Sequence, residues 1–518
     1  MDIYLDANAT TPVLPAAAQA ALAAMAEDFG NPSSVHSTGL KARALIDGVR
    51  ERARRIVGAG PGRLLFTSGA TEGIQTAVLS ALSALRGRDG LRWLLYGATE
   101  HKAVPEALRH WNALLGLGLD VRAIPVDKQG RHDLAFLREH AAAAGLVCTM
   151  AANNETGIVS DLAGIAAALE GSTAFWMVDC VQALGKLPLD LAASRIDYAP
   201  FSGHKLYAPK GIGLLYVRAE APFTPLMAGG GQEGALRSGT ENMAGIAGLG
   251  AVLAALEDGG TFRSHAELAD FRLQLLEALR EALPGLVLNA PLESSLPTTL
   301  NFAVPGLPSR LLQDLFDAGG VRVSGGSACS AAKAAPSFVL EAMQLPDWQA
   351  AGAVRLSIGP AADAAMVREA CVRIRACGEA LRRHGPQHGP WCEEPGPLDV
   401  PPEAACRSVL GEQLADFLAR QPELVVVDVR EPYEHALPLP ALFSGVDVQA
   451  VPMGCLAGAA PDWVASGRPL LFFCRSGGRS RQAAQALAAM GHAQSWTLAG
   501  GLALLPQAAA AADPALYV

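Results

Sequence analysis

Residues 176–205 read WMVDCVQALGKLPLDLAASRIDYAPFSGHK. The apolar residues before Asp179 predict a buried strand that ends in a carboxylate, and open α/β sheets bind their ligands at this end of their strands. About 26 residues later, Lys205 stands among small residues, where its amine can reach a carbonyl group and form a Schiff base. We therefore expect Asp179 and Lys205 to meet at one edge of a sheet.

The pattern around this stretch indicates an α/β fold. Short apolar runs alternate with Ala- and Leu-rich stretches of helical character, which is typical of a parallel sheet covered by helices on both faces. A long helical stretch, residues 244–283, then leads into a smaller α/β unit that ends near His384. The predicted strands are residues 64–67, 93–96, 146–150, 175–178 and 213–217.

The first predicted strand runs into the turn Ser68-Gly69-Ala70-Thr71, which precedes a helix. Backbone N–H groups at a helix start bind phosphate, although an ordinary helix cap explains most turns of this kind. An aspartate that faces a pyridine nitrogen keeps it protonated and so makes the ring an electron sink. A phosphate turn, an aspartate and a lysine in this order predict a site for pyridoxal 5'-phosphate (PLP).

The chain has 518 residues, which are too many for one hydrophobic core, so we expect several domains. A content of 50% hydrophobic and 18% charged residues indicates a globular protein, and the net charge of −9 disfavours direct nucleic-acid binding. The N-terminus, MDIYLDANATTP, lacks the basic and apolar regions of a secretion signal. The longest apolar stretch, residues 244–256, is too short to span a membrane, so we expect a cytoplasmic protein.

The clearest boundary in the chain is a linker at residues 385–405. This segment, GPQHGPWCEEPGPLDVPPEAA, is rich in Pro and Gly and shows no hydrophobic periodicity. It separates the candidate PLP region, residues 1–384, from a second α/β pattern over residues 406–518.

The second domain holds a candidate reactive cysteine. The apolar run 470–473 ends in Cys474, and a loop with Arg475 and Arg479 then leads into a helix. N–H groups at a helix start and two arginines would lower the pKa of the thiol and favour a bound anion, whereas the alternative is a core cysteine at a strand end. No metal site is predicted. One further group of Cys and His residues lies close together in the sequence, but their spacings match those of no common zinc site. That group is Cys371, Cys377, His384 and His388.

Ten short segments together resemble the cysteine desulfurases, which are PLP enzymes of fold type I in aminotransferase class V. The resemblance extends from residue 1 to about residue 380 and is specific in combination. It implies a large domain over about residues 16–260 and a small domain made of residues 1–15 and about 261–384. The segments are Leu5–Pro12, Thr67–Glu72, Glu100–His101, Asn153–Gly157, Asp179–Gln182, Ser202–Lys205, Gly229–Gln232, Arg237–Asn242, Ser327–Cys329 and Val354–Ser357.

The resemblance implies a role for each matching residue. Lys205 would hold PLP as a Schiff base, His101 would stack on the ring and act in acid–base steps, and Asp179 would pair with the pyridine nitrogen. Gln182 would contact the phenolic oxygen, and Arg355 would bind the substrate carboxylate together with Asn154. A homodimer is implied because one phosphate contact would come from Thr240 of the partner subunit. The residues that would bind the cofactor are Ala70, Thr71, His101, Asn154, Asp179, Gln182, Ser202, His204, Lys205 and Thr240.

The resemblance also implies that Cys329, in a Gly- and Ser-rich stretch, is the nucleophile. Its thiolate would take the sulfur of L-cysteine, which leaves a persulfide and releases L-alanine. The context resembles the iron–sulfur-assembly group of desulfurases. Residues 324–326 and 232–234 depart from that group, because Ser-Gly-Gly and Gln-Glu-Gly replace Ser-Ser-Gly and Gln-Glu-Arg. A selenocysteine lyase is the nearest alternative.

The segment from about residue 406 to residue 518 resembles a rhodanese. Cys474 would carry a persulfide there, and Asp428-Val-Arg430 matches a second motif of that family, although residues 436–441 replace its usual Gly-His-Ile-Pro-Gly-Ala. We expect sulfur to pass from Cys329 to Cys474 and on to an acceptor protein or a small thiol. The expected destinations are iron–sulfur cluster, thio-cofactor or tRNA thiolation pathways, and the alternative is a docking module without chemistry. The persulfide loop would consist of Arg475, Ser476, Gly477, Gly478 and Arg479.

Overall fold

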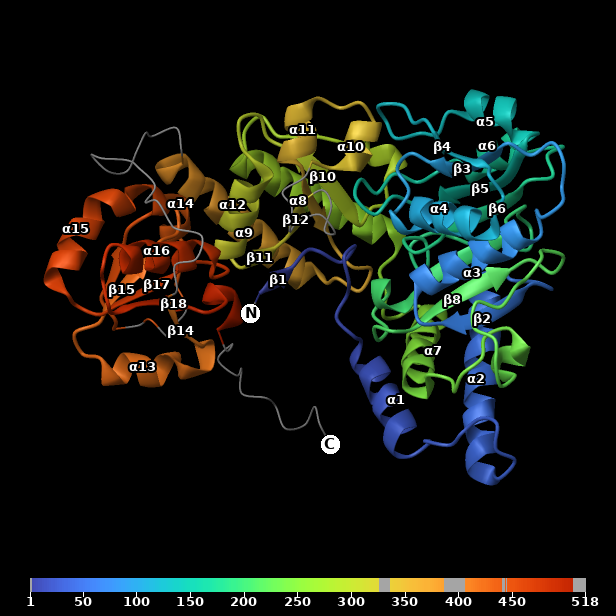
Figure 1. Ribbon diagram of the computed structural model, residues 1–518, viewed down its shortest axis with the longest axis horizontal. Helices are drawn as coiled ribbons and strands as arrows, with labels where there is room; N and C mark the ends of the chain where they lie inside the picture. Colours follow the sequence, from blue (N-terminus) through green and yellow to red (C-terminus); the bar gives the residue numbers. More distant parts are fainter. Residues whose placement is uncertain (1, 326–335, 386–405, 440–442, 444, 506–518) are drawn as a thin grey trace.

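The computed structural model describes residues 2–325, 336–385, 406–439, 443 and 445–505. These residues form three bodies, which follow one another from blue to red in Figure 1, except that the N-terminal strand, in dark blue, belongs to the second of them. We call them the large body (α1 to α7), the small body (β1 and α8 to α12) and the C-terminal body (β14 onward). Within the described ranges, none of the helices combines the length and the apolar run needed to cross a bilayer.

A seven-stranded sheet in the order β2-β8-β7-β6-β5-β3-β4 forms the centre of the large body. All five strands predicted from the sequence are present, whereas β4 and β7 were not predicted. The expectation of a parallel sheet fails at one strand, because β8 runs antiparallel to both of its neighbours. The strands are β2 (Arg63–Thr67), β3 (Trp93–Gly97), β4 (Asp120–Ile124), β5 (Ala144–Met150), β6 (Phe175–Asp179), β7 (Tyr198–Ser202) and β8 (Gly213–Val217).

Helices cover both faces of this sheet, because successive side chains of a buried strand point to opposite sides. In β6, Trp176 belongs to one apolar cluster with α2, α5, α6 and α7, while Met177 belongs to another with α3 and α4. The predicted α/β architecture is therefore confirmed for this body. Its helices are α1 (Pro15–Ala26), α2 (Ser37–Ile56), α3 (Ala70–Ser83), α4 (Ala103–Leu115), α5 (Leu134–Ala141), α6 (Leu162–Ala168) and α7 (Met243–Asp258).

The long helical stretch predicted at residues 244–283 is two helices, so that prediction is wrong in this detail. Gly259 ends α7 with a left-handed φ of 72°, which glycine adopts at low cost. Ser264 then begins α8 with a capping box, in which it and Glu267 satisfy each other's backbone N–H groups. The break marks the passage from the large body to the small body.

The small body contains an antiparallel sheet in the order β12-β13-β10-β9. The N-terminus belongs to this body, because β1 (Ile3–Tyr4) pairs in parallel with β11 (Val321–Arg322). The sheet strands are β9 (Val287–Leu288), β10 (Thr299–Ala303), β12 (Ser324–Gly325) and β13 (Val354–Ser357). The helices are α8 (His265–Ala282), α9 (Ser309–Ala318), α10 (Phe338–Ala342), α11 (Asp347–Gly352) and α12 (Ala364–His384).

The C-terminal body has its own five-stranded sheet, in the order β14-β18-β17-β15-β16, with every pair parallel. Separate apolar clusters lie on its two faces, so it is a second α/β unit as predicted. Its strands are β14 (Arg407–Val409), β15 (Val425–Asp428), β16 (Val448–Ala450), β17 (Leu470–Phe473) and β18 (Ser495–Leu498). Its helices are α13 (Leu414–Arg420), α14 (Pro432–His435), α15 (Leu456–Ser466) and α16 (Gly478–Ala489).

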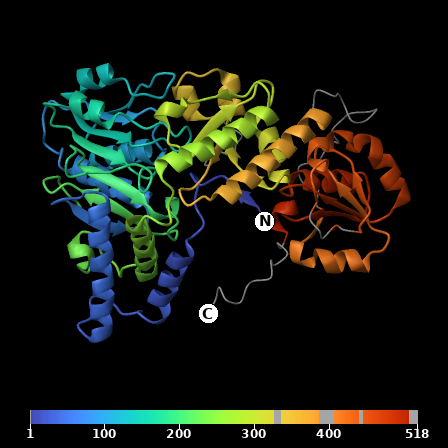
Figure 2. The same cartoon turned by 180° about the vertical axis from the view of Figure 1, so that it is seen from behind.

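The C-terminal body packs against the small body. Tyr433 and Leu437 are buried in the apolar cluster that fills the small body, and α14 contacts both α9 and α12. Figure 1 and the reverse view in Figure 2 show the two bodies side by side. Apart from Gly385, the predicted linker at residues 385–405 lies outside the described residues.

Candidate active site

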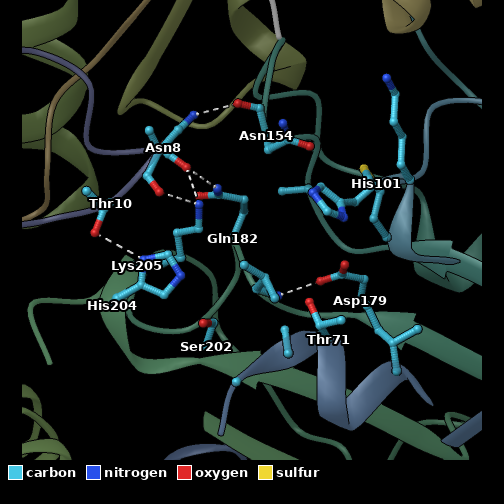
Figure 3. Close-up of a pocket in the computed structure, with 18 of the residues that line it drawn as sticks. Asn8, Thr10, Thr71, His101, Asn154, Asp179, Gln182, Ser202, His204 and Lys205 are labelled. Atoms are coloured by element: carbon cyan, nitrogen blue, oxygen red, sulfur yellow. Dashed lines mark hydrogen bonds between the residues drawn. The ribbon is translucent and has the colours of Figure 1, made fainter. Parts of the chain in front are cut away.

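A cavity of about 590 Å³ lies at the carboxyl ends of β5, β6 and β7 (Figure 3). The N-terminal segment, the starts of α3 and α4, and β13 of the small body complete its lining. The cavity therefore lies where the large body meets the small body. It brings together ten residues predicted from the sequence, which are Ala70, Thr71, His101, Asn154, Asp179, Gln182, Ser202, His204, Lys205 and Arg355.

Lys205 lies in the short turn that follows β7. Its Nζ donates hydrogen bonds to the backbone oxygens of Asn8 and Ala9, each at 2.7 Å. The side-chain amide of Asn8 donates in turn to the backbone oxygen of Asn154 at 3.2 Å. Sequence reasoning assigned Asn8 no role, and the signal that could have found it is the motif Leu5–Pro12, in which it stands.

Asp179 is the last residue of β6 and is buried. Burial raises the pKa of its carboxyl group, while a hydrogen bond from the Val181 N–H at 2.9 Å and the charges of His101 and Lys205 oppose the rise. Burial and the nearby Asp179 also raise the pKa of Glu100 well above its ordinary range. A carboxylate in such a place favours a cationic group beside it, and a protonated pyridine nitrogen is one.

The start of α3 forms an anion-binding corner. Gly69 precedes this helix with a φ of 154°, and no described side chain caps its first N–H groups. The free N–H groups of a helix start favour a phosphate, and Thr71, Ser202 and His204 lie around the same corner (Figure 3). Burial, aided by two neighbouring lysines, lowers the pKa of His204 to about 4, so its ring is neutral at pH 7.

His101 faces the cavity just before α4. Its Nδ1 accepts a hydrogen bond from the Ala103 N–H at 3.2 Å, so the neutral ring carries its proton on Nε2. Burial lowers the pKa of His101, against the opposing charge of Asp179. The ring is therefore neutral near pH 7, which suits a group that exchanges protons with a substrate.

Arg355 reaches the cavity from β13 of the small body and is only 1% exposed. Its Nη1 donates to the backbone oxygen of Asn154 at 2.8 Å, and its Nη2 donates to Asp6 at 2.6 Å. Its Nε has no hydrogen-bond partner among the described residues. A guanidinium held at the cavity wall in this way suits a carboxylate ligand.

Glu155 is a further cavity residue that the sequence reasoning missed. Its carboxylate accepts a hydrogen bond from the Ser337 hydroxyl at 2.6 Å, and both side chains are buried. Burial raises its pKa to about 7. The neighbouring Phe338 also lines the cavity, with the Nζ of Lys102 at 5.3 Å from its ring centre. The motif Asn153–Gly157 was the available signal for Glu155.

Thr240 was predicted for this site but does not line the cavity. Thr240 is exposed, and its contact with the phosphate of a partner subunit stays a prediction. Cys329 lies outside the described residues, between Gly325 of β12 and Pro336. No group of His, Cys, Asp and Glu that could hold a metal ion occurs within the described part of the chain.

Cys474 forms a second candidate centre at the end of β17. Its Sγ accepts hydrogen bonds from the backbone N–H groups of Gly477 at 3.2 Å and Ser480 at 3.4 Å, and the residue is 1% exposed. Arg479 donates two hydrogen bonds to the buried Glu434, at 2.6 and 2.9 Å. Burial acts to lower the pKa of Arg479, but these bonds and the negative charges of Glu434 and Asp314 outweigh it and raise the pKa. The start of α16 therefore cradles the sulfur with N–H groups.

The motif Asp428-Val-Arg430 is structural in this chain. The Arg430 guanidinium donates to the Asp428 carboxylate at 2.8 to 3.0 Å, and both side chains are buried. Burial acts to raise the pKa of Asp428, but His435 and Arg430 outweigh it and hold the pKa below its usual range. The pair thus fixes the end of β15 beside the Cys474 strand, to which β15 is paired.

Comparisons with known proteins agree with the geometry of the first site. Residues 3–369 match the aminotransferase class-V family. A cysteine desulfurase of Sinorhizobium fredii is 38% identical over 358 residues, which are 69% of this chain and 91% of that protein. A cysteine desulfurase named NifS, from Azotobacter vinelandii, is also 38% identical and covers 69% of this chain and 88% of its own length.

A solved structure of a NifS-like protein is 32% identical, with a TM-score of 0.65 over 74% of this chain and 100% of that one. Residues 370–518 lie beyond the family match, so it leaves the C-terminal body unassigned. From the match over residues 3–369 and from these relatives, the chain belongs to the aminotransferase class-V family, among relatives that are cysteine desulfurases.

Proposed function

We propose that the chain is a PLP-dependent cysteine desulfurase, which releases L-alanine from L-cysteine and keeps the sulfur as a persulfide on Cys329. The observation that carries this proposal is the cavity in which Lys205, Asp179 and the start of α3 face one another. The relatives named cysteine desulfurase support the reaction. A solved structure of SspA in complex with cysteine, 29% identical with a TM-score of 0.60 over 70% of this chain and 99% of that one, supports the substrate.

The side chains of the cavity fit the cofactor. When bound, PLP supplies an electron sink for the bonding electrons at the substrate Cα. Lys205 would hold it through the amine, Asp179 would pair with its pyridine nitrogen, and the start of α3 would bind its phosphate. Gln182 would contact its phenolic oxygen. The Oε1 of Gln182 accepts a hydrogen bond from Lys186 at 2.6 Å, and one N–H of its amide donates to the backbone oxygen of Asn8 at 3.1 Å. Its second N–H can then serve the cofactor.

The other side of the cavity would bind and protonate the substrate. Arg355 and Asn154 would hold the carboxylate, so that the Cα–H bond faces Lys205. Lys205 would move the proton at Cα, and neutral His101 would exchange a proton through Nε2. The role of His101 depends on its neutral ring, which burial favours by lowering the pKa of His101.

The sulfur-transfer step would belong to Cys329. Its thiolate attacks the substrate sulfur, an S–S bond forms and the C–S bond breaks. The electron pair of the broken bond stays with the substrate carbon, which takes up a proton to become the methyl group of L-alanine. The outer sulfur remains on Cys329 as a persulfide.

The desulfurase proposal predicts that Cys329→Ser binds PLP and cysteine but releases almost no alanine. Alanine release and the persulfide mass of the Cys329 peptide would be measured in wild type and variant, with Cys148→Ser as the control for a buried cysteine of the large-body core. Alanine release at the wild-type rate in Cys329→Ser would place the nucleophile elsewhere. Supplying selenocysteine in the same assay separates a desulfurase from a selenocysteine lyase.

We infer that the chain works as a homodimer in which Thr240 completes the phosphate site of the partner subunit. Large apolar side chains of the α1–α2 region are exposed in the single chain, which supports an interface there. Sedimentation of the holoenzyme would measure the mass. These side chains are Leu22, Met25, Phe29, Val35 and Leu40.

We further propose that the C-terminal body is a rhodanese-like sulfurtransferase that receives the sulfur. The supporting observation is the pair of N–H groups directed at the Cys474 sulfur, which would stabilise a thiolate or a persulfide. The Cys474 thiolate would attack the outer sulfur of the Cys329 persulfide, and Cys329 would leave as a thiolate. An acceptor protein or a small thiol would then take the sulfur toward iron–sulfur cluster assembly or thiolation.

A further inference from the structure

The loop that carries Cys474 faces helix α9 of the small body. The Nε of Arg475 lies 2.7 Å from the carboxylate of Asp314, and Nη2 of Arg479 lies 3.8 Å from it. The first contact is an ion pair without hydrogen-bond geometry, since both atoms lack a hydrogen-bond partner. Figures 1 and 2 both show the C-terminal body beside α9.

Arg475 differs from Arg479 in which body supplies its nearest ion-pair partner. Arg479 is bound by Glu434 of its own body at 2.6 Å. Among the described residues, Arg475 forms its ion pairs with two carboxylates of α9, those of Asp314 at 2.7 Å and Asp317 at 3.8 Å. An arginine beside a sulfur-transfer cysteine is a binding group for an anionic donor or acceptor. Here the Asp314 carboxylate of the small body already pairs with the Arg475 guanidinium.

Asp314 is well held in this position. It is 5% exposed, and Arg310, one helical turn earlier, places its Nε 3.0 Å from the second carboxylate oxygen. The same helix contacts β12, after which the segment with Cys329 begins. Helix α9 therefore touches both the Cys474 loop and the strand that precedes Cys329 in the chain.

We propose that Asp314 acts as a built-in competitor for anions at the Cys474 loop. Its carboxylate neutralises Arg475, so an external anionic sulfur donor must displace it before it can bind. The proposal rests on the proposed sulfurtransferase role of Cys474. Asp314 contacts no reacting atom, so it is a specificity-determining residue that discriminates against free anionic donors in favour of sulfur delivered from the chain itself.

Thiosulfate and cyanide probe this competition in the full-length holoenzyme. The Cys474 thiolate attacks the outer sulfur of thiosulfate, the S–S bond breaks and sulfite leaves with the electron pair. Cyanide then removes the sulfur as thiocyanate and restores the thiolate. In Asp314→Asn we expect KM for thiosulfate to fall about tenfold with little change in kcat, since one charged competitor is removed. Alanine release from cysteine should stay at the wild-type rate.

Asp416→Asn is the matched control, because Asp416 is an exposed carboxylate of α13 whose pairing is with Arg420 of the same helix. Its KM for thiosulfate should equal that of wild type. Cys474→Ser gives the background that does not depend on this cysteine. A Cys474-dependent activity whose KM is the same in wild type and Asp314→Asn overturns the proposal. If Cys474 supports no turnover in either protein, the proposed sulfurtransferase role fails, and this inference fails with it.

A second measurement separates charge from loosened packing. The rates at which iodoacetate, an anion, and iodoacetamide, which is neutral, alkylate Cys474 would be followed by mass spectrometry. Removal of a charged competitor should raise the iodoacetate rate several-fold relative to the iodoacetamide rate. An equal rise for both reagents would mean that the substitution only opens the contact between the bodies, and the competitor role would be rejected.

Discussion

Lys205 and Lys102 both line the first cavity, but they make different contacts. Lys205 donates to two backbone oxygens of the N-terminal segment, whereas Lys102 places its Nζ 5.3 Å from the ring centre of Phe338. If Lys205 forms the covalent bond to PLP, Lys205→Ala should lose the visible absorbance of the bound cofactor, and Lys102→Ala should keep it. Absorbance spectra after incubation with PLP and desalting measure this. A Lys205→Ala protein with the wild-type spectrum would contradict the assignment.

Glu155 gives a residue-scale prediction about pH. Its pKa is raised from 4.5 to about 7, chiefly by burial, so the folded state holds a proton that the unfolded state releases in this window. Stability is therefore lost as the pH rises from about 4.5 to 7, by up to about 3 kcal/mol. Relative to Glu155→Gln, the wild-type melting temperature should fall between pH 5 and pH 7.5. Glu379→Gln, which changes an exposed carboxylate, should show no such difference.

The residues that carry the proposed chemistry could be predicted from the sequence, whereas the contacts that hold them in place could not. Asp179 and Lys205 stand next to recognisable strands and turns, so their meeting at one sheet edge followed from the pattern. Asn8 contacts Lys205 across 197 positions of sequence, and Ser337 contacts Glu155 across 182 positions. Local patterns carry no information about such distant partners.

At the scale of elements, two differences between the predicted and the observed strands, the missed β7 and the direction of β8, have a physical reason. β7 reads Tyr-Ala-Pro-Phe-Ser, and its central Pro200 argues against a strand inside a sheet. β8 was found by its apolar run, but strand direction depends on the connection that precedes it. The loop between β7 and β8, with the turn at Lys205, reverses the chain, so β8 returns antiparallel where a crossover helix would have kept it parallel.

The N-terminus of α16 gives a prediction at this scale. Gly477 has a φ of 84°, and a Cβ added there would lie 2.9 Å from the backbone nitrogen of Gly500. Gly477→Ala should displace the N–H that bonds the Cys474 sulfur and reduce thiosulfate turnover at least tenfold. Gly467→Ala is the matched control, since Gly467 has a φ of 64° in the same body with nothing within 4 Å of its Cβ position.

Gly467→Ala should cost about 1 kcal/mol of stability, because alanine is strained in the left-handed region, but it should leave turnover intact. Thermal unfolding and thiocyanate formation would be measured on both variants. Equal losses of activity in the two glycine variants would mean that stability, and not the sulfur cradle, determines turnover.

At the scale of the whole molecule, the contact between the small and the C-terminal bodies is the feature that no local pattern could predict. It joins Tyr433 and Leu437 to the core of the small body and pairs Arg475 with Asp314, across a segment that reads only as a linker. The sequence predicted that the two α/β units exist. Their mutual orientation depends on side chains scattered over both, none of which has a distinctive motif.

The docked arrangement bears directly on the proposed sulfur relay. A tether keeps the two cysteines at a high effective concentration when it can span the gap between them, so transfer within the assembly should outpace transfer to a free acceptor. We expect sulfur from labelled cysteine to reach Cys474 only when Cys329 is present, and to accumulate on Cys329 in Cys474→Ser. Persulfide mapping by mass spectrometry in wild type, Cys329→Ser and Cys474→Ser measures both outcomes.

Mixing the two single variants then tests whether the transfer crosses between chains. In the proposed homodimer, a mixed dimer would combine the intact Cys329 of Cys474→Ser with the intact Cys474 of Cys329→Ser. Label on Cys474 in that mixture requires transfer between chains. Because α9 of each chain pairs with the Cys474 loop of the same chain, we expect wild type to label Cys474 faster than the mixture does. Full persulfidation of Cys329 with no label on Cys474 in wild type would refute the relay, even with both centres active alone.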